Sequence, residues 1–182
     1  SLWKQLVLSY KNIKNNTQAC RDHVTRCSKL RELTIIHPDA DGGYLESIIR
    51  SDKIMSVVMK AKNTLTSLSV SDLELSNSSF RKISQITQLT SLDINALKIQ
   101  SDGLSQLRWL SKLRSLIIRN LPDDVVCFRY LNDLVNSLCL NLNSQLEKVE
   151  LMDHREHQEW TRDKSIRYNL PNFRPFFWVY VN

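Results

Sequence analysis

The chain has 182 residues, of which 42% are hydrophobic and 24% are charged. This composition is typical of a folded globular domain and excludes a disordered chain. No apolar run reaches the roughly 18 residues of a membrane-spanning helix. The formal net charge of +6 permits an acidic partner but bears more on solubility and encounter than on fold.

One apolar pattern occurs six times, in the form Leu-x-x-Leu-x-Leu with conservative substitutions. The spacing from Leu65 to Leu89 and from Leu89 to Leu113 is 24 residues in each case. A fixed unit of about this length is typical of leucine-rich repeats, and two wider spacings indicate insertions. The six copies begin at Trp3, Leu30, Leu65, Leu89, Leu113 and Leu146.

Each copy predicts a strand whose fourth and sixth residues point to the same face. One strand cannot bury that apolar face alone, whereas strands stacked side by side can. The residue that begins each copy, from Trp3 to Leu146, is expected to close the turn into its strand. The residues expected to face the core are Leu6, Leu8, Leu33, Ile35, Leu68, Val70, Leu92, Ile94, Leu116, Ile118, Val149 and Leu151.

The segments between the copies predict helices. Apolar residues recur at helical spacing in residues 78–88 and 102–112, with Ser78 or Ser79 as the expected N-cap of the first helix and Asp102 of the second. The insertions at 43–64 and 123–142 also have helical patterns. The predicted fold is α/β: a leucine-rich-repeat solenoid of about six irregular repeats over residues 1–152, with a curved parallel sheet inside and helices outside. An ordinary α/β layer fold with leucine-rich strands is the alternative.

The pattern ends after Met152. Residues 153–182 begin with a polar stretch and end with the aromatic run "FRPFFWVYV". We expect this segment to be either a cap on the solenoid or a truncated further repeat.

Two phrases resemble a known family. "VTRCSKLRELTI", from Val24 to Ile35, resembles the cysteine-containing leucine-rich repeats of F-box proteins, where a Cys stands three residues before the next strand's first Leu. Here that pair is Cys27 and Leu30; polar residues such as Thr87 and Ser111 stand near the corresponding place in other copies. "SLWKQLVLS", Ser1–Ser9, is similar to the close of an F-box.

The resemblance covers residues 1–152 and implies the substrate receptor of an SCF-type ubiquitin ligase. The F-box helices would then precede Ser1 and bind a Skp-type adaptor and cullin, while the repeats hold a target protein. Such a receptor carries out no chemistry itself, so the chain is not expected to be an enzyme or to bind a cofactor. It is expected in the cytoplasm or nucleus.

Two polar segments invite a metal-site hypothesis, and in both the spacing argues against one. Asp39, Asp41 and Glu46 lack the ligand number and offsets of an EF-hand, and fit a turn into a helix instead. His154 and His157 are three residues apart, which is not the HExxH spacing. The four cysteines form no CxxC and are expected to be free thiols in a reducing compartment.

The candidate binding surface is the concave face of the predicted sheet, formed by the third, fifth and seventh residues of each copy. Its middle is small and polar, whereas aliphatic and charged residues gather toward the carboxyl-terminal copies, as in protein contact patches. Acidic residues interrupt any basic stripe, which disfavours nucleic acid, and no membrane partner is expected. The candidate contact residues are Ile117, Arg119, Lys148, Glu150 and Met152.

Three functional hypotheses follow. The first is the target-binding part of an F-box receptor. The second is a leucine-rich-repeat scaffold from another setting, such as an immune sensor or a regulatory protein. The third is an enzyme of unrecognised class, although the chain contains no GxSxG, P-loop or GxGxxG motif.

Overall fold

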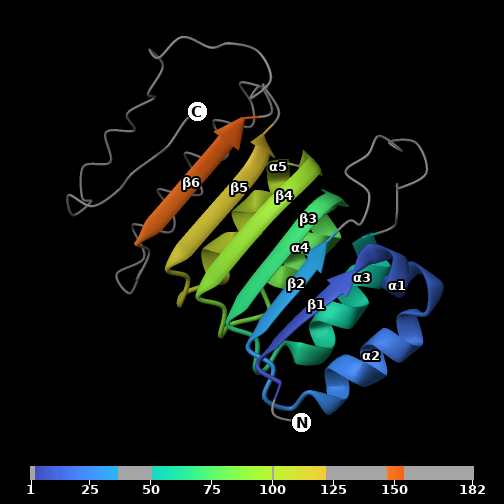
Figure 1. Ribbon diagram of the computed structural model, residues 1–182. Coiled ribbons are helices and arrows are strands. Elements are labelled where there is room, and N and C mark those ends of the chain that lie inside the picture. The colour runs from blue at the N-terminus through green and yellow to red at the C-terminus, as the bar shows by residue number, and fades with distance from the viewer. Residues whose placement is uncertain (1–2, 37–50, 100, 122–146, 154–182) are drawn as a thin grey trace, which may run out of the picture.

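Six parallel strands form one sheet, in the order in which they occur along the chain (Figure 1). The computed structural model describes residues 3–36, 51–99, 101–121 and 147–153. The predicted α/β class with a parallel sheet is confirmed, and every strand begins two residues after the first residue of its copy. The strands are β1 (Gln5–Ser9), β2 (Glu32–Ile36), β3 (Ser67–Leu75), β4 (Ser91–Ile99), β5 (Ser115–Leu121) and β6 (Lys148–Asp153).

The register of the strands places equivalent residues side by side. Leu68 is the partner of Leu92, and Leu92 is the partner of Leu116. The same column continues through Leu33 and Leu6 on one side and Val149 on the other. Leu33, Leu68, Leu92 and Leu116 are at most 1% exposed. The predicted register is therefore correct for all six copies, and the alternation of buried and accessible residues follows from it.

A repeated backbone contact fixes this register. The carbonyl oxygen of the residue just before a strand accepts two N–H bonds, one from the residue just before the next strand and one from that strand's first residue. Lys4 O accepts from Arg31 N at 2.7 Å and from Glu32 N at 2.9 Å. The same pair of bonds, at 2.7 to 3.0 Å, is accepted by the carbonyl oxygens of Arg31, Thr66, Thr90 and Arg114.

The turns into β2, β4 and β5 are closed by buried residues three apart. The N–H of Leu30 donates to the Cys27 carbonyl at 2.9 Å, and the N–H of Cys27 donates to Val24. The same two hydrogen bonds recur before β4, where Leu89 N–H donates to Ile86 and Ile86 N–H to Ile83. They recur again before β5, where Leu113 N–H donates to Leu110 and Leu110 N–H to Leu107. The counterparts of Cys27 are therefore Ile86 and Leu110, all three buried, and not the polar Thr87 and Ser111. Cysteine is therefore one of several apolar residues that occupy this buried position of the repeat.

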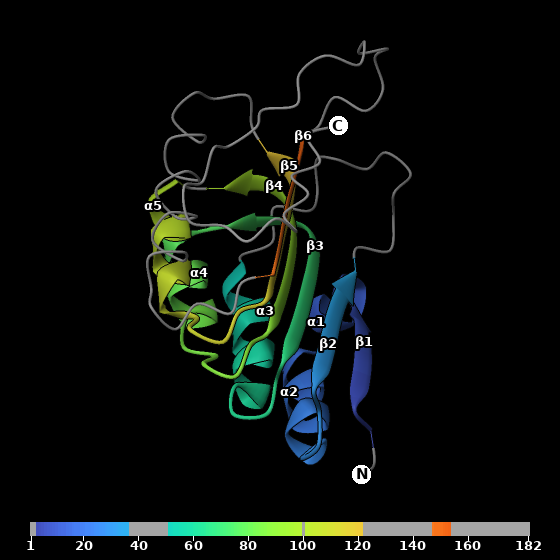
Figure 2. The same ribbon diagram turned by 90° about the vertical axis from the view of Figure 1, so that its left-hand side faces the viewer.

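Helices cover one face of the sheet, as the view in Figure 2 shows for α3, α4 and α5. Their apolar sides form a continuous core with the inward residues of the strands, and Phe80, Ile83 and Leu107 are fully buried in it. The predicted helix over 123–142 and the tail at 154–182 lie outside the described residues. The helices are α1 (Tyr10–Asn15), α2 (Thr17–Arg26), α3 (Ser51–Val58), α4 (Asn77–Ile83) and α5 (Ser101–Leu104), and the 3₁₀ helices are η1 (Met59–Ala61) and η2 (Ser105–Trp109).

Both predicted helix caps are wrong. Helix α4 begins earlier than expected, and its N-cap is Ser76, whose side-chain oxygen accepts from the backbone N–H of Ser79 at 3.3 Å. Ser79 is itself fully buried within the helix. Asp102 lies inside α5 rather than at its cap. A run of serines offers several capping candidates, and the end of β3 decides among them because that strand extends to Leu75.

The expected role of Trp3 is also wrong. Leu30, Leu65, Leu89 and Leu113 are at most 2% exposed and close their turns as predicted, but Trp3 is 64% exposed. The indole therefore lies at the surface beside the edge strand β1.

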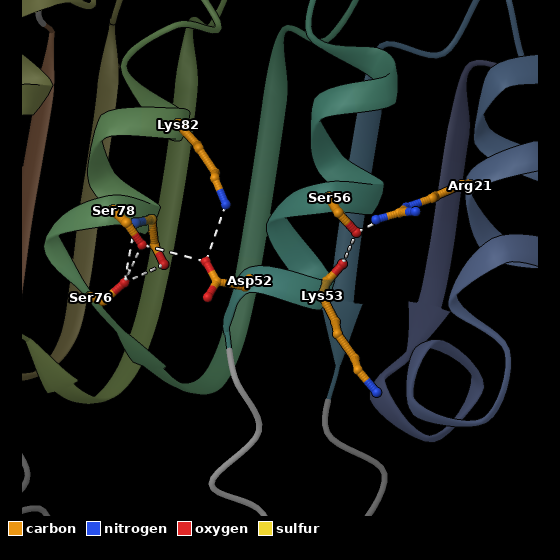
Figure 3. A network of polar contacts seen from close by, with 8 residues as sticks. Arg21, Asp52, Lys53, Ser56, Ser76, Ser78 and Lys82 are labelled. Carbon is orange, nitrogen blue, oxygen red and sulfur yellow. Dashed lines mark hydrogen bonds and ion pairs between the residues drawn. The ribbon is translucent and has the colours of Figure 1, made fainter.

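Polar contacts tie the helices to one another (Figure 3). The Arg21 Nε of α2 donates to the Ser56 hydroxyl of α3 at 3.0 Å. The Asp52 carboxylate of α3 accepts from Lys82 Nζ of α4 at 3.1 Å. These contacts are exposed or partly buried, so each contributes little to stability. They orient the helix layer, whereas the apolar core supplies the driving force.

In the described part of the chain, none of the helices combines the length and apolar character required to cross a membrane.

Truncation of Leu92 to Ala tests the register. The side chain is fully buried in the middle of the sheet, so we expect the substitution to lower the free energy of unfolding by about 2–5 kcal/mol. Ser91→Ala is the control, because the neighbouring side chain points to the other face and its loss leaves no cavity in the core. Urea denaturation measures both; equal losses at the two positions would contradict this orientation.

Gly103 provides a second stability test, in which two effects oppose each other. An alanine in a helix is ordinarily more stable than a glycine by about 0.5–1 kcal/mol. Here, however, an added Cβ would lie 2.3 Å from Cδ2 of the fully buried Phe80 ring. The clash dominates, so Gly103→Ala should destabilise the protein by about 1–3 kcal/mol.

The double variant Gly103→Ala with Phe80→Leu isolates this contact. Because leucine vacates the space that the ring occupies, the combined loss should be smaller than the sum of the two single losses. Urea denaturation of the four proteins measures the coupling. Additive losses would show that Gly103 is constrained by something other than Phe80.

Candidate functional site

The face of the sheet opposite the helices is open to solvent in the described structure. It is lined by the first, third and fifth residues of the strands, which are the predicted third, fifth and seventh positions of the copies. Its middle is small and polar, with Ser67, Ser69 and Ser71 on β3 and Ser91 on β4, all partly accessible. Larger side chains lie to either side, so the face has two flanks of different chemistry.

The flank formed by β1 and β2 exposes two aliphatic side chains. Val7 is 60% exposed and Ile36 is 40% exposed, and the register places each two residues from the other's partner. Below them the Gln5 amide donates to the Glu32 carboxylate across the same two strands. The sequence analysis favoured the opposite flank. The signal for this one was present in Val7 and Ile36, the aliphatic residues of the exposed columns of these two copies.

The flank formed by β4 and β5 contains an ion pair. The Arg119 guanidinium of β5 donates to the Asp93 carboxylate of β4 through two bonds, Nε to Oδ1 at 3.1 Å and Nη2 to Oδ2 at 3.0 Å. The two side chains are 39% and 26% exposed. Paired donors of a guanidinium match the two oxygens of a carboxylate and hold both groups in one orientation. The ion pair therefore holds both side chains in a fixed orientation next to Ile117. We call this pair of side chains the Arg119–Asp93 plate.

The predicted contact residues are brought together in part. The register places Ile117 opposite Glu150 and Ser115 opposite Lys148. Lys148 is exposed and Ile117 is partly buried. Arg119 is engaged with Asp93, on the side away from β6. The side chains of Glu150 and Met152 lie outside the described residues, although the backbone of both belongs to β6.

A depression lies on the helix side, at the end of the sheet formed by β1. It has a volume of about 410 Å³ and is lined by residues of β1, α1 and α2, including Leu8, Cys20 and His23. Burial raises the pKa of the Cys20 thiol, which keeps the sulfur protonated near neutral pH. A protonated thiol is a poor nucleophile, so this arrangement does not suit covalent catalysis.

Metal-binding groups do not gather in the parts of the chain that the structure describes. Among residues 3–36, 51–99, 101–121 and 147–153, no three His, Cys, Asp or Glu side chains form a group that could hold a metal ion. The segments discussed for metal binding, with Asp39, Asp41, His154 and His157, lie outside these ranges. Of the four cysteines, Cys20 and Cys27 are described, and both are free and buried.

Comparison of the chain with protein-family models, with curated proteins and with solved structures finds no match.

The Arg119–Asp93 pair can be tested by a double-mutant cycle. Because the contact is bidentate and partly shielded from water, we expect a coupling free energy of about 1 kcal/mol, at the upper end for accessible pairs. Arg119→Ala, Asp93→Ala and the double variant would be compared by urea denaturation. Arg114→Ala with Asp93→Ala is the control, since Arg114 pairs at 3.5 Å with Glu147, the residue before β6. Equal coupling in both cycles would contradict a specific pair.

Proposed function

We propose that the chain is a protein-binding module built as a leucine-rich-repeat solenoid, with a target protein on the open face of its sheet. The observation that carries this proposal is the sheet itself: six parallel strands in chain order, in one register, with the described helices on one side. In such an array neighbouring strands offer a continuous surface that no single unit has.

The chemistry of the open face supports a protein ligand rather than a small molecule. Its accessible residues form a broad surface with apolar side chains at β1 and β2, small hydroxyls in the middle and the Arg119–Asp93 plate at β5. Arginine is enriched at protein interfaces, and exposed aliphatic side chains supply the apolar area that such interfaces bury. The candidate contacts are Ile117, Arg119, Lys148, Glu150 and Met152, and Val7 and Ile36 extend the surface to the other flank.

We further propose that this module is the target-recognition part of an F-box receptor. The support is the resemblance of Ser1–Ser9 to the close of an F-box and of Val24–Ile35 to a cysteine-containing repeat. The equivalence of Cys27 with Ile86 and Leu110 supports a repeat in which this buried place varies among apolar residues. In such a receptor the adaptor and the target bind different parts of the protein.

Affinity capture from cells tests both parts of the proposal. The bait is the full-length protein that contains these 182 residues, as wild type, as the open-face variant Val7→Asp with Arg119→Glu, and as the helix-side control Asn12→Asp with Arg81→Glu. The two double variants change the net charge equally, and Asn12 and Arg81 are exposed residues of α1 and α4. Thermal unfolding of each protein checks that it is folded.

All three baits should capture a Skp-type adaptor and a cullin, and the open-face variant should recover its targets at least roughly tenfold less well. Such a loss corresponds to about 1.4 kcal/mol of binding free energy. If the helix-side control loses the same targets, the open face is not the binding surface. If no bait brings down an adaptor or cullin, the F-box proposal is wrong and a leucine-rich-repeat scaffold of another class takes its place.

A further inference from the structure

The edge of the sheet at which the strands begin carries a concentration of positive charge. All six strands point the same way, so the turns that precede them lie along one edge (Figure 1). Ten exposed cations belong to these turns, to the helix ends that lead into them and to the strand starts. They are Lys4, Arg26, Lys29, Arg31, Lys60, Lys62, Arg108, Lys112, Arg114 and Lys148, and we call this set the basic edge.

The basic edge holds more positive charge than the chain as a whole. Among the described residues of these turns and strand starts, the acidic side chains are Glu32 and Glu147. The formal net charge of the complete sequence is +6, so the remainder of the protein is close to neutral or acidic. The sequence hides this concentration because the cations are separated by about one repeat unit and meet only when the units stack.

Helix stability accounts for some of these charges. Arg26, Lys60 and Arg108 lie in the last turns of α2, η1 and η2, where a cation interacts favourably with the helix dipole. The same reason does not apply to Lys4, Arg31, Arg114 and Lys148, which lie at strand starts, or to Lys29 and Lys112, which lie in turns. More than half of the charge therefore has no role in holding a helix.

The cations form two clusters separated by a neutral turn. The first cluster surrounds the starts of β1, β2 and β3, and the second surrounds the starts of β5 and β6. The turn before β4 contains Gln85, Thr87, Gln88 and Thr90, which are uncharged. The last turn of α4 carries Arg81 and Lys82, which lie further back along the chain from the strand start than Arg26, Lys60 and Arg108 do in their units, and Lys82 pairs with Asp52. At about 4.8 Å per strand, β3 and β5 are two intervals apart, which separates the facing strand starts of the two clusters by about 10 Å.

This arrangement distinguishes among acidic partners. A nucleic acid or an anionic lipid surface presents evenly repeated negative charge, for which the neutral turn and the two carboxylates are unfavourable places. A protein segment can group its acidic residues to match two clusters and place a basic or neutral residue between them. Exposed tryptophans flank the edge at Trp3 and at Trp109, whose ring lies 5.1 Å from the Arg108 guanidinium, and such residues are typical of protein interfaces.

We propose that the basic edge is a docking site for an acidic protein segment that carries two groups of carboxylates. The site is separate from the open face, and the proposal does not depend on what the open face binds. Extended chain covers about 3.3–3.6 Å per residue, so about three residues between the two acidic groups bridge the neutral turn.

Fluorescence anisotropy with a labelled peptide tests the proposal on the whole 182-residue chain. The probe has two short blocks of glutamate joined by about three Gly and Ser residues, and the same peptide with glutamine in place of glutamate is its control. A single-stranded oligonucleotide and vesicles containing phosphatidylserine are the competing probes. Raising the salt concentration from about 0.05 to about 0.5 M should weaken binding of the glutamate peptide roughly tenfold or more.

Matched charge reversals distinguish binding at the basic edge from a general effect of the protein's net charge. Lys29→Glu with Lys62→Glu alters the first cluster, Arg108→Glu with Lys112→Glu alters the second, and Lys11→Glu with Lys14→Glu alters exposed cations of α1 at the opposite edge. Each pair changes the net charge equally. Each edge variant should weaken binding of the glutamate peptide about tenfold, and the α1 variant less than about twofold.

The proposal fails if the α1 variant weakens binding as much as the edge variants, because binding then follows net charge alone. It also fails if the oligonucleotide or the vesicles bind more tightly than the glutamate peptide, or if the glutamine peptide binds equally well. Circular dichroism of each variant checks that the fold is retained, and an edge variant that unfolds is replaced by Lys29→Gln with Lys62→Gln or Arg108→Gln with Lys112→Gln.

Discussion

The rest of this structure depends on one backbone contact, in which the carbonyl oxygen just before a strand accepts hydrogen bonds from two consecutive N–H groups at the start of the next strand. Because Lys4, Arg31, Thr66, Thr90 and Arg114 each bind two consecutive N–H groups of the next strand, every strand begins level with its neighbour. A one-residue slip would turn the leucines of a strand toward solvent. The backbone contact and the burial of leucine therefore select the same register, and neither has to be strong alone.

This shared register explains why sequence could predict some parts of the molecule and not others. Leu68, Leu92 and Leu116 were predictable as a buried column because strand alternation depends only on local spacing. The cap at Ser76 was not, since several serines can satisfy the same N–H groups and only the length of β3 decides among them. Trp3 was misjudged because the pattern identifies a position in a unit but does not reveal how exposed the side chain at that position is.

The candidate surfaces show the same division. The columns of the open face follow from alternation, so Ile117 and Lys148 were found, and Val7 and Ile36 stood in the same columns. The diagonal pairing of Arg119 with Asp93 was not predictable, because it joins different positions of two units and depends on side-chain reach. The basic edge was not found from the sequence, since its residues are about one unit apart, do not follow the apolar pattern and become neighbours only across strands.

The repeated carbonyl contact also determines which changes in chain length the fold can accept. A whole unit, such as residues 89–112, could be duplicated in tandem, because the new strand would find the same acceptor before it and present the same acceptor after it. The sheet would widen by about 4.8 Å and every existing neighbour contact would keep its form. A single residue inserted between Leu89 and Leu92 would instead invert one strand against both neighbours. Genes for such an array are therefore expected to vary by complete units, which changes the breadth of the open face while preserving its construction.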